Sequence, residues 1–256
     1  MSGVTIIDDY ASARARFLAL AKSAGADVKS HTHVVRGPKG EDLALDVAWF
    51  GPADAPKVFL CTSSMHGLEG PVGSAAQAAW IASGAPERLP RDVAVCLVHA
   101  LNPWGFAYFA RCTENNVDLN RNWLDFKGPP PQNPEYRYIR DLIRMRTFTA
   151  EAIGDLARGY EEVRAKLGAG RLSIAVNHGQ YEDPQGLQFG GRAPEFGHRM
   201  VREHVLPRLS HARDVGLLDW HTGVGDYGET AYLITHGIDA ALGARAVAWW
   251  GEENVR

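Results

Sequence analysis

The sequence predicts an α/β protein of three layers, α/β/α, in which helices cover both faces of a central mixed, mostly parallel sheet. Short apolar runs typical of buried strands alternate with longer segments whose apolar residues recur at helical spacing. Such alternation is typical of parallel sheets covered on both sides. The chain has 256 residues, of which 45% are hydrophobic, so it can build a sizeable core. Because no internal repeat or low-complexity linker divides it, we expect one domain over residues 1–256.

The N-terminal part of the chain predicts two helices and four strands. Apolar side chains at helical spacing, with basic residues between them, predict an amphipathic helix that ends near Gly25. The sequence Gly-Pro-Lys-Gly at 37–40 predicts a turn between two strands. In order, we expect a helix over 10–24, strands over 31–36, 43–50 and 58–62, an alanine-rich helix over 71–82, and a strand over 93–99.

The remaining elements follow a long irregular segment. Residues 102–134 show little periodicity, and a segment of that length without regular structure is usually functional or disordered. Its polar content favours function. A glycine-rich loop is expected over 177–191. In order, we expect a helical connector over 135–167, a strand over 172–176, a helix over 194–209, strands over 215–221 and 231–235, and a helix over 238–250.

Composition argues against several classes of partner. The formal net charge is −3 and both signs are mixed along the chain, which disfavours a nucleic-acid groove or an anionic membrane surface. Three cysteines, an odd number without a CxxC pair, favour reduced thiols. The N-terminus does not resemble a secretory signal, and no window reaches the roughly 18 consecutive apolar residues of a membrane span. We expect a cytoplasmic protein without nucleic-acid or membrane partners, and the sequence leaves its oligomeric state open.

Three side chains predict a metal site. His66 and Glu69 lie in a glycine-containing loop directly after the predicted strand 58–62, and His221 lies where a later apolar run opens into a glycine loop. Two histidines and one carboxylate leave the fourth position on zinc open, which is typical of catalytic rather than structural sites. The alternative is a solvated loop with an incidental HxxE and a histidine of the core.

A second polar loop, over 111–123, combines two arginines, an aspartate and several amides. Arginine recognises a carboxylate through planar, bidentate hydrogen bonds, and neighbouring Asn amides can complete such a site. Taken alone, the segment favours a surface loop held by Asx turns.

Together these segments resemble the zinc carboxypeptidase family, the clan of carboxypeptidase A, and its relatives the succinylglutamate desuccinylases and aspartoacylases. The form of the first motif and the loop 177–191 are similar to an uncharacterised bacterial branch near those relatives. The resemblance spans residues 58–228. In order, the matching motifs are His66…Glu69, Asn102-Pro103…Arg111…Asp118-Leu119-Asn120-Arg121-Asn122, and Asp219-Trp220-His221.

The resemblance implies a zinc ion held by His66, Glu69 and His221. Asp118 is then expected to orient His66, because a ligating imidazole usually donates its other N–H to a carboxylate or carbonyl. Asp219 lies two residues before His221, so on a strand it would share that face and help to shape the site.

The resemblance also implies the chemistry. Asn120 and Arg121 are expected to hold the terminal carboxylate of a small peptide or N-acyl amino acid, and Arg111 is expected to stabilise the oxyanion. The implied activity is that of a metallocarboxypeptidase-like zinc hydrolase, which cleaves an amide bond next to a free carboxylate. The alternatives are an N-acyl-amino-acid deacylase and a zinc-binding protein without turnover.

One part of the family pattern has no match. The family's general base is a glutamate on a late strand, whereas this sequence ends at Arg256, soon after His221. Glu229 is the nearest glutamate after His221, in a position where the family has a loop, and it is not assigned as the base. We therefore expect a zinc carboxypeptidase-like domain over 1–256 that lacks its last strands through C-terminal truncation.

Overall fold

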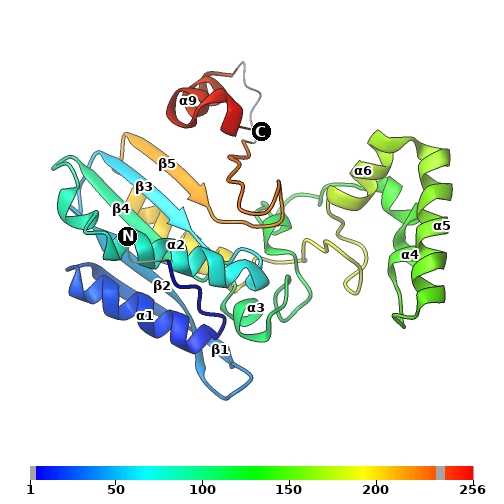
Figure 1. Cartoon of the computed structure of the whole chain (residues 1–256), viewed down its shortest axis with the longest axis horizontal. Coiled ribbons are helices and arrows are strands. Elements are labelled where there is room, and N and C mark those ends of the chain that lie inside the picture. Colours follow the sequence, from blue (N-terminus) through cyan, green and yellow to red (C-terminus); the bar gives the residue numbers. More distant parts are fainter. Residues whose placement is uncertain (1–3, 235–239, 256) are drawn as a thin grey trace. The chain divides into compact units, whose positions relative to one another are not determined.

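The computed structural model describes residues 4–234 and 240–255 (Figure 1). The chain forms two compact units, Met1–His221 and Thr222–Arg256. The sheet and every side chain of the predicted zinc and substrate site belong to the first unit. The assignment of 1–256 to a single domain stays a prediction.

Within the described residues, five strands form one mixed sheet in the order β1-β2-β4-β3-β5. β1 pairs antiparallel with β2 and β2 with β4, whereas β3 pairs in parallel with both β4 and β5. This confirms the predicted α/β class and the parallel core of the sheet. Since parallel strands end at the same edge, the loops after β3, β4 and β5 emerge together, where α/β proteins usually bind ligands. The strands are β1 (Asp27–Arg36), β2 (Asp42–Phe50), β3 (Lys57–Thr62), β4 (Val93–His99) and β5 (Asp214–Asp219).

Helices cover both faces of the sheet, which confirms the three layers (Figure 1). One face carries α1 (Tyr10–Ser23) and α2 (Gly70–Ala82). The fully buried Phe17 of α1 packs there among apolar side chains of the strands, a burial that contributes about 1.5–3 kcal/mol. Asp9 begins α1 by accepting a hydrogen bond from the backbone N–H of Ser12 at 2.9 Å.

The other face carries the helical segment predicted over 194–209. It runs through α7 (Phe196–Met200), a π-helical turn η5 (Val201–Val205) and α8 (Leu206–Leu209). Pro207 has no N–H to donate, and a proline inside a helix disturbs the preceding turn, which accounts for the π-helical widening. Val201 and Val205 point into the core against the sheet.

The structure changes two predictions between β4 and β5. The predicted strand 172–176 is part of helix α6 (Ala169–Asn177). Leu172 and Ala175, three residues apart, are its buried side chains and pack beside Tyr136 and Ile139, so helical packing prevails over the β propensity of a short apolar run. The segment 102–134 is irregular over most of its length, as expected, but it contains the helix α3 (Pro103–Tyr108).

The remaining elements are short except for one long helix. The predicted helical connector 135–167 is confirmed in outline, with an interruption between α4 and α5. These elements are η1 (Gly67–Glu69), η2 (Pro86–Arg88), η3 (Leu119–Arg121), η4 (Pro134–Tyr138), α4 (Arg140–Ile143) and α5 (Ala150–Leu167).

The second unit contains α9 (Ala241–Trp250) and η6 (Glu252–Asn254). Of the predicted helix 238–250, residues 238 and 239 lie outside the described part. Of the predicted strand 231–235, residue 235 lies outside it, and the rest reduces to a single β-bridge between Tyr232 and Val255.

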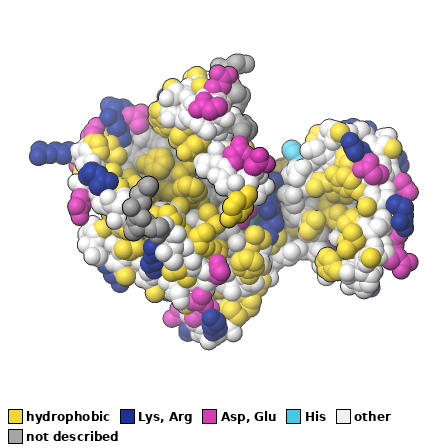
Figure 2. Space-filling model, in the orientation of Figure 1, with side chains coloured by type: hydrophobic (Ala, Val, Ile, Leu, Met, Phe, Trp, Pro, Cys, Tyr) yellow, Lys and Arg dark blue, Asp and Glu magenta, His cyan; other side chains and the backbone are white. Residues whose placement is uncertain are grey.

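Two further features concern the hydropathy of the helices and the charges on the surface. Within the described residues, no helix combines the length and the apolar character required to cross a membrane. On the face shown in Figure 2, Lys and Arg side chains are interspersed with Asp and Glu.

Candidate metal centre

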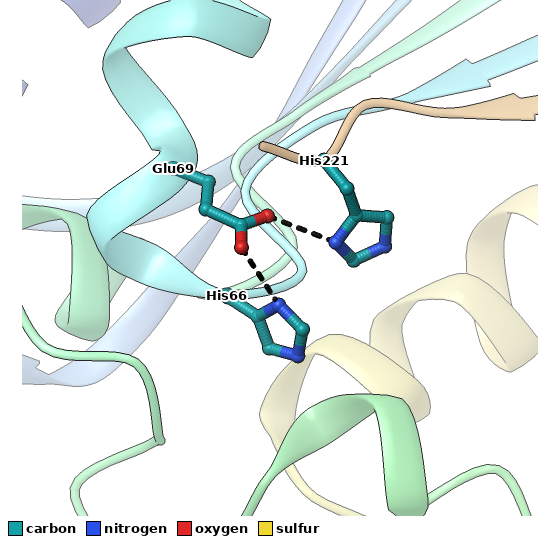
Figure 3. A group of neighbouring side chains, drawn as sticks. All are labelled: His66, Glu69 and His221. Carbon is teal, nitrogen blue, oxygen red and sulfur yellow. Dashed lines mark hydrogen bonds and ion pairs between the residues drawn. The ribbon is translucent and has the colours of Figure 1, made fainter. Parts of the chain in front are cut away.

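The predicted metal ligands converge at the edge of the sheet where the parallel strands end. His66 follows β3, Glu69 closes the short helix η1, and His221 lies two residues beyond the end of β5. The three side chains point toward one another (Figure 3). The pairing of β3 with β5 thus brings together residues that are far apart in the sequence.

The loop that carries His66 is held by a close backbone approach. A Cβ atom on Gly67 would lie 2.0 Å from the carbonyl carbon of Gly105, so this position requires glycine. The Gly67 N–H donates to the carbonyl of Arg111 at 3.2 Å. Asn102 caps α3 by accepting from Gly105 N–H at 2.8 Å, and its amide donates to the same Arg111 carbonyl at 3.4 Å. The Asn-Pro motif therefore fixes the first metal loop against the segment that carries Arg111.

Glu69 lies between the two imidazoles. Its Oε1 is 3.1 Å from His66 Nδ1, and its Oε2 is 2.8 Å from His221 Nδ1. One potential ligand atom from each residue lies within 4.8 Å of the others. His66 and Glu69 are buried, with 4% and 6% exposure, whereas the His221 side chain is 28% exposed. The group is therefore enclosed on the side of the first two residues and open toward solvent at the third.

A carboxylate backs each imidazole. His66 Nε2 is 3.2 Å from Asp118 Oδ1, and His221 Nε2 is 2.8 Å from Asp219 Oδ2. With both Nε2 atoms engaged in this way, both Nδ1 atoms face the centre of the group. Carboxylate–histidine pairs of this kind orient metal-binding imidazoles and raise their basicity.

The electrostatics of the group follow from these contacts. Burial raises the pKa of Glu69, but hydrogen bonds from His221 and His66 outweigh it and lower that pKa to about 2. Burial lowers the pKa of His221, yet hydrogen bonds to Asp219 and Glu69 raise it to about 10. The pKa of His66 is raised in the same way: its bonds to Asp118 and Glu69 overcome burial. The site thus attracts positive charge at the position where the two Nδ1 atoms and Glu69 meet.

The group fits a divalent metal ion. Two imidazole nitrogens and one carboxylate form the donor set of several catalytic zinc sites. Each imidazole already has the carboxylate partner that fixes its ring. Because one ligand is partly exposed, the open position on a bound ion could face solvent or substrate.

Arg111 lies beside this group and is linked to it through Asp118. Its Nε and Nη2 donate to Asp118 Oδ2 at 3.2 and 3.1 Å. The Asp118 side chain is fully buried, whereas that of Arg111 is 42% exposed. Burial raises the pKa of Asp118, but the hydrogen bond with His66 and the charge of Arg111 lower it to about 2. A buried carboxylate therefore holds the arginine in place and leaves part of the guanidinium accessible.

Asn120 and Arg121 lie in η3, the short helix that Asp118 caps. The Asn120 N–H donates to Asp118 Oδ1 at 3.0 Å. Arg121 donates to the carbonyls of Asn120 and Asn177 at 3.2 and 2.8 Å, and its own carbonyl accepts from Tyr181 Oη at 2.7 Å. Both residues thus follow the carboxylate that contacts His66, and the Arg121 guanidinium is bound to carbonyl oxygens.

Two residues that support the site were not predicted from the sequence. Thr62 donates from Oγ1 to Asp219 Oδ1 at 2.6 Å, and only the register of β3 and β5 reveals that neighbour. Asn122 is buried, and its amide donates to the carbonyls of Gly190 and Ala193 at 2.9 Å. Asn122 lies within the segment that carries the resemblance, so the motif itself was the available signal.

Comparisons with known proteins identify the family of this chain and a similar fold. The model of the family described as "Protein of unknown function (DUF2817)" matches residues 7–256. The curated proteins contain no match.

Among solved structures, the chain is similar to carboxypeptidase A from Helicoverpa armigera, with 16% identity and a TM-score of 0.53 over 94% of this chain and 51% of that one. The chain therefore spans about half the length of that carboxypeptidase. A metallo-carboxypeptidase from Burkholderia cenocepacia matches at 21% identity and a TM-score of 0.31, over 43% of this chain and 31% of the other. A glutaminyl cyclase from Tannerella forsythia matches at 14% identity and a TM-score of 0.32, over 82% and 75%. The first of these similarities shows a carboxypeptidase-like fold.

Proposed function

We propose that this chain, which belongs to the DUF2817 family, is a zinc-dependent hydrolase that cleaves an amide bond next to a free carboxylate. The observation that supports the proposal most is the convergence of His66, Glu69 and His221, with a carboxylate behind each imidazole. The carboxypeptidase-like fold is consistent with this chemistry, since the group lies at the carboxyl ends of the parallel strands.

The metal would be held by the two Nδ1 atoms and the Glu69 carboxylate. Zinc in an open three-ligand site supplies Lewis acidity and lowers the pKa of bound water to about 7. Asp118 and Asp219 keep the imidazoles oriented, each through its contact with an Nε2 atom.

Arg111 would stabilise the negative charge that develops on the carbonyl oxygen of the substrate. That role requires a positive group held in place before the reaction, because reorientation during the reaction costs energy. The paired hydrogen bonds to Asp118 provide this restraint, and the exposed part of the guanidinium provides the contact surface.

Asn120 and Arg121 would bind the free carboxylate of the substrate. The Arg121 guanidinium now donates to the Asn177 carbonyl, which a substrate carboxylate would replace as the acceptor. A carboxylate forms stronger, charge-assisted hydrogen bonds with arginine than a neutral carbonyl does.

The test is a hydrolysis assay on the full chain loaded with zinc. Peptides and N-acyl amino acids with a free C-terminal carboxylate are compared with the same compounds as C-terminal amides. We expect turnover of the free acids only, its loss after chelation, and its recovery with added zinc. Preference for N-acyl amino acids over peptides would identify the deacylase. Zinc binding without any turnover would contradict the hydrolase and leave a zinc-binding protein.

A further inference from the structure

The two proposed histidine ligands are supported unequally. The carboxylate behind His66 is fully buried and is also bound by Arg111 and by the Asn120 N–H. His221 is more exposed and lies beyond the end of its strand. Its support comes from Asp219, whose side chain is 19% exposed, so the position of that carboxylate depends on what else holds it.

Thr62 holds Asp219. The Thr62 hydroxyl donates to Asp219 Oδ1 at 2.6 Å, while the other carboxylate oxygen is 2.8 Å from His221 Nε2. One oxygen of Asp219 therefore faces the hydroxyl and the other faces the imidazole. These contacts form a chain of three side chains from the end of β3 to the proposed metal ligand.

The pairing of β3 with β5 builds this chain. Thr62 and Asp219 are register partners in the parallel ladder, and the Trp220 N–H donates to the Thr62 carbonyl at 3.1 Å just beyond it. Thr62 is buried, with 5% exposure, and a β-branched side chain has few χ1 rotamers. Burial and the restricted χ1 angle therefore limit where the Thr62 hydroxyl can lie. The hydroxyl can then hold the plane of the Asp219 carboxylate.

We propose that Thr62 is a positioning residue for His221: it holds the Asp219 carboxylate in the plane that orients the ring, so that Nδ1 points at the metal. The inference rests on the proposed function only in that it requires a metal at this site. Neither residue needs to contact the metal or the substrate. Thr62 acts through Asp219, and Asp219 acts through the imidazole.

The test measures metal binding rather than activity. Competition titrations with zinc, using the full chain, compare the wild type with Thr62→Val, Thr62→Ser and Asp219→Asn. Loss of a partner of a metal-bound histidine typically lowers metal affinity by about 10–100-fold. We expect about a tenfold loss for Thr62→Val, at least that for Asp219→Asn, and recovery toward wild-type affinity in Thr62→Ser, which keeps the hydroxyl.

A second readout separates positioning from a loss of stability. The visible absorption spectrum of the Co²⁺-loaded chain reports the coordination geometry, and it should change in Thr62→Val and return in Thr62→Ser. Thr32→Val is the matched control, because Thr32 is also a strand-paired threonine but lies exposed on β1. It should leave both the affinity and the spectrum unchanged.

Two results would overturn the inference, and they differ in scope. If Thr62→Val and Asp219→Asn lower the unfolding temperature of the metal-free chain but keep wild-type zinc affinity and the wild-type Co²⁺ spectrum, the two residues are merely structural. In that case the proposed function stands. If the wild type binds neither metal, both the inference and the proposed function fail.

Discussion

At the scale of single residues, the proposed metal centre carries an excess of negative charge. Three carboxylates and one guanidinium surround two imidazoles, so with neutral imidazoles the formal charge of the group is two negative charges. Either two protons or one divalent cation can neutralise them. The raised pKa values of the two histidines show that the metal-free group takes up protons. The carboxylates are those of Glu69, Asp118 and Asp219, and the guanidinium is that of Arg111.

Metal binding should therefore release protons. The pKa of His221 is raised from 6.5 to about 10, so at pH 7 the metal-free ring is protonated and must lose that proton to bind zinc. We expect zinc affinity to rise with pH up to about 10. Calorimetry at pH 7 in buffers of different ionisation enthalpy should detect release of at least about one proton per zinc. A binding enthalpy that does not depend on the buffer would contradict the protonated state of His221.

The same shift affects the stability of the metal-free chain in the opposite direction. A raised pKa means that the folded state binds the proton more tightly than the unfolded state does. This stabilisation is fully present below the unfolded value of about 6.5 and is lost as the pH rises through about 10. Raising the pH thus weakens the metal-free fold while it strengthens metal binding.

Arg111 should affect turnover more than metal content. Removing one preorganised donor to an oxyanion typically lowers kcat by about 100–1,000-fold. We expect a loss of that size for Arg111→Ala on the substrate identified by the hydrolysis assay, with zinc still bound. Arg121→Ala is the comparison variant and should raise KM instead. An Arg111→Ala enzyme with wild-type kcat would exclude the oxyanion role.

The sequence predicted which residues would form the proposed metal site better than which residues support them. His66, Glu69 and His221 were predicted from their positions after apolar runs, and the structure brings them together. Asp118 was expected beside His66 and lies there. Thr62 could not be found in this way, because its contact depends on which strand lies beside β3 and in what register.

At the scale of elements, the loop after α6 restrains Arg121. Gly179 has a φ of +83°, and a Cβ atom there would lie 2.7 Å from Arg121 Cδ. The last residue of α6, Asn177, supplies a carbonyl that accepts from Arg121, and Tyr181 in the loop donates its hydroxyl to the Arg121 carbonyl. Backbone conformation and close packing at Gly179 therefore both bear on the proposed carboxylate site.

Gly179→Ala should therefore weaken substrate binding as well as lower the stability of the fold. A non-glycine residue in a sparsely populated backbone region costs about 1–3 kcal/mol, measurable by urea unfolding. Displacement of Arg121 should in addition raise KM for substrates with a free carboxylate. Gly40→Ala is the control: its φ is +81° and nothing lies within 4 Å of the added Cβ, so it should lose stability without a change in KM. Equal KM values for the two variants would show that the loop does not position Arg121.

The prediction of secondary structure was wrong at α6, where packing decides between helix and strand, and it missed α3. The apolar run at 172–176 was compatible with a strand, and its helical state in α6 follows from contacts with η4, which lies far earlier in the sequence. Helix α3 was overlooked although its signals were present. Asn102 is its N-cap and Pro103 its first residue, a combination typical of helix starts.

At the scale of the whole molecule, alternating apolar patterns were sufficient to predict the α/β class and the helices on both faces. They did not predict the strand order, because no local sequence pattern indicates that β4 lies between β2 and β3. That order makes β3 and β5 parallel neighbours and places their ends side by side. The proposed metal centre therefore depends on the strand order as well as on the sequence motifs.

The central claim, that this fold holds a zinc ion through these three side chains, is tested most directly by the zinc content of the purified full chain. Elemental analysis after dialysis should find about one zinc per chain in the wild type, as expected for a single three-ligand site. Glu69→Ala and His221→Ala should lose it. Zinc absent from a folded wild-type chain exposed to it, or retained undiminished in both variants, would contradict the account.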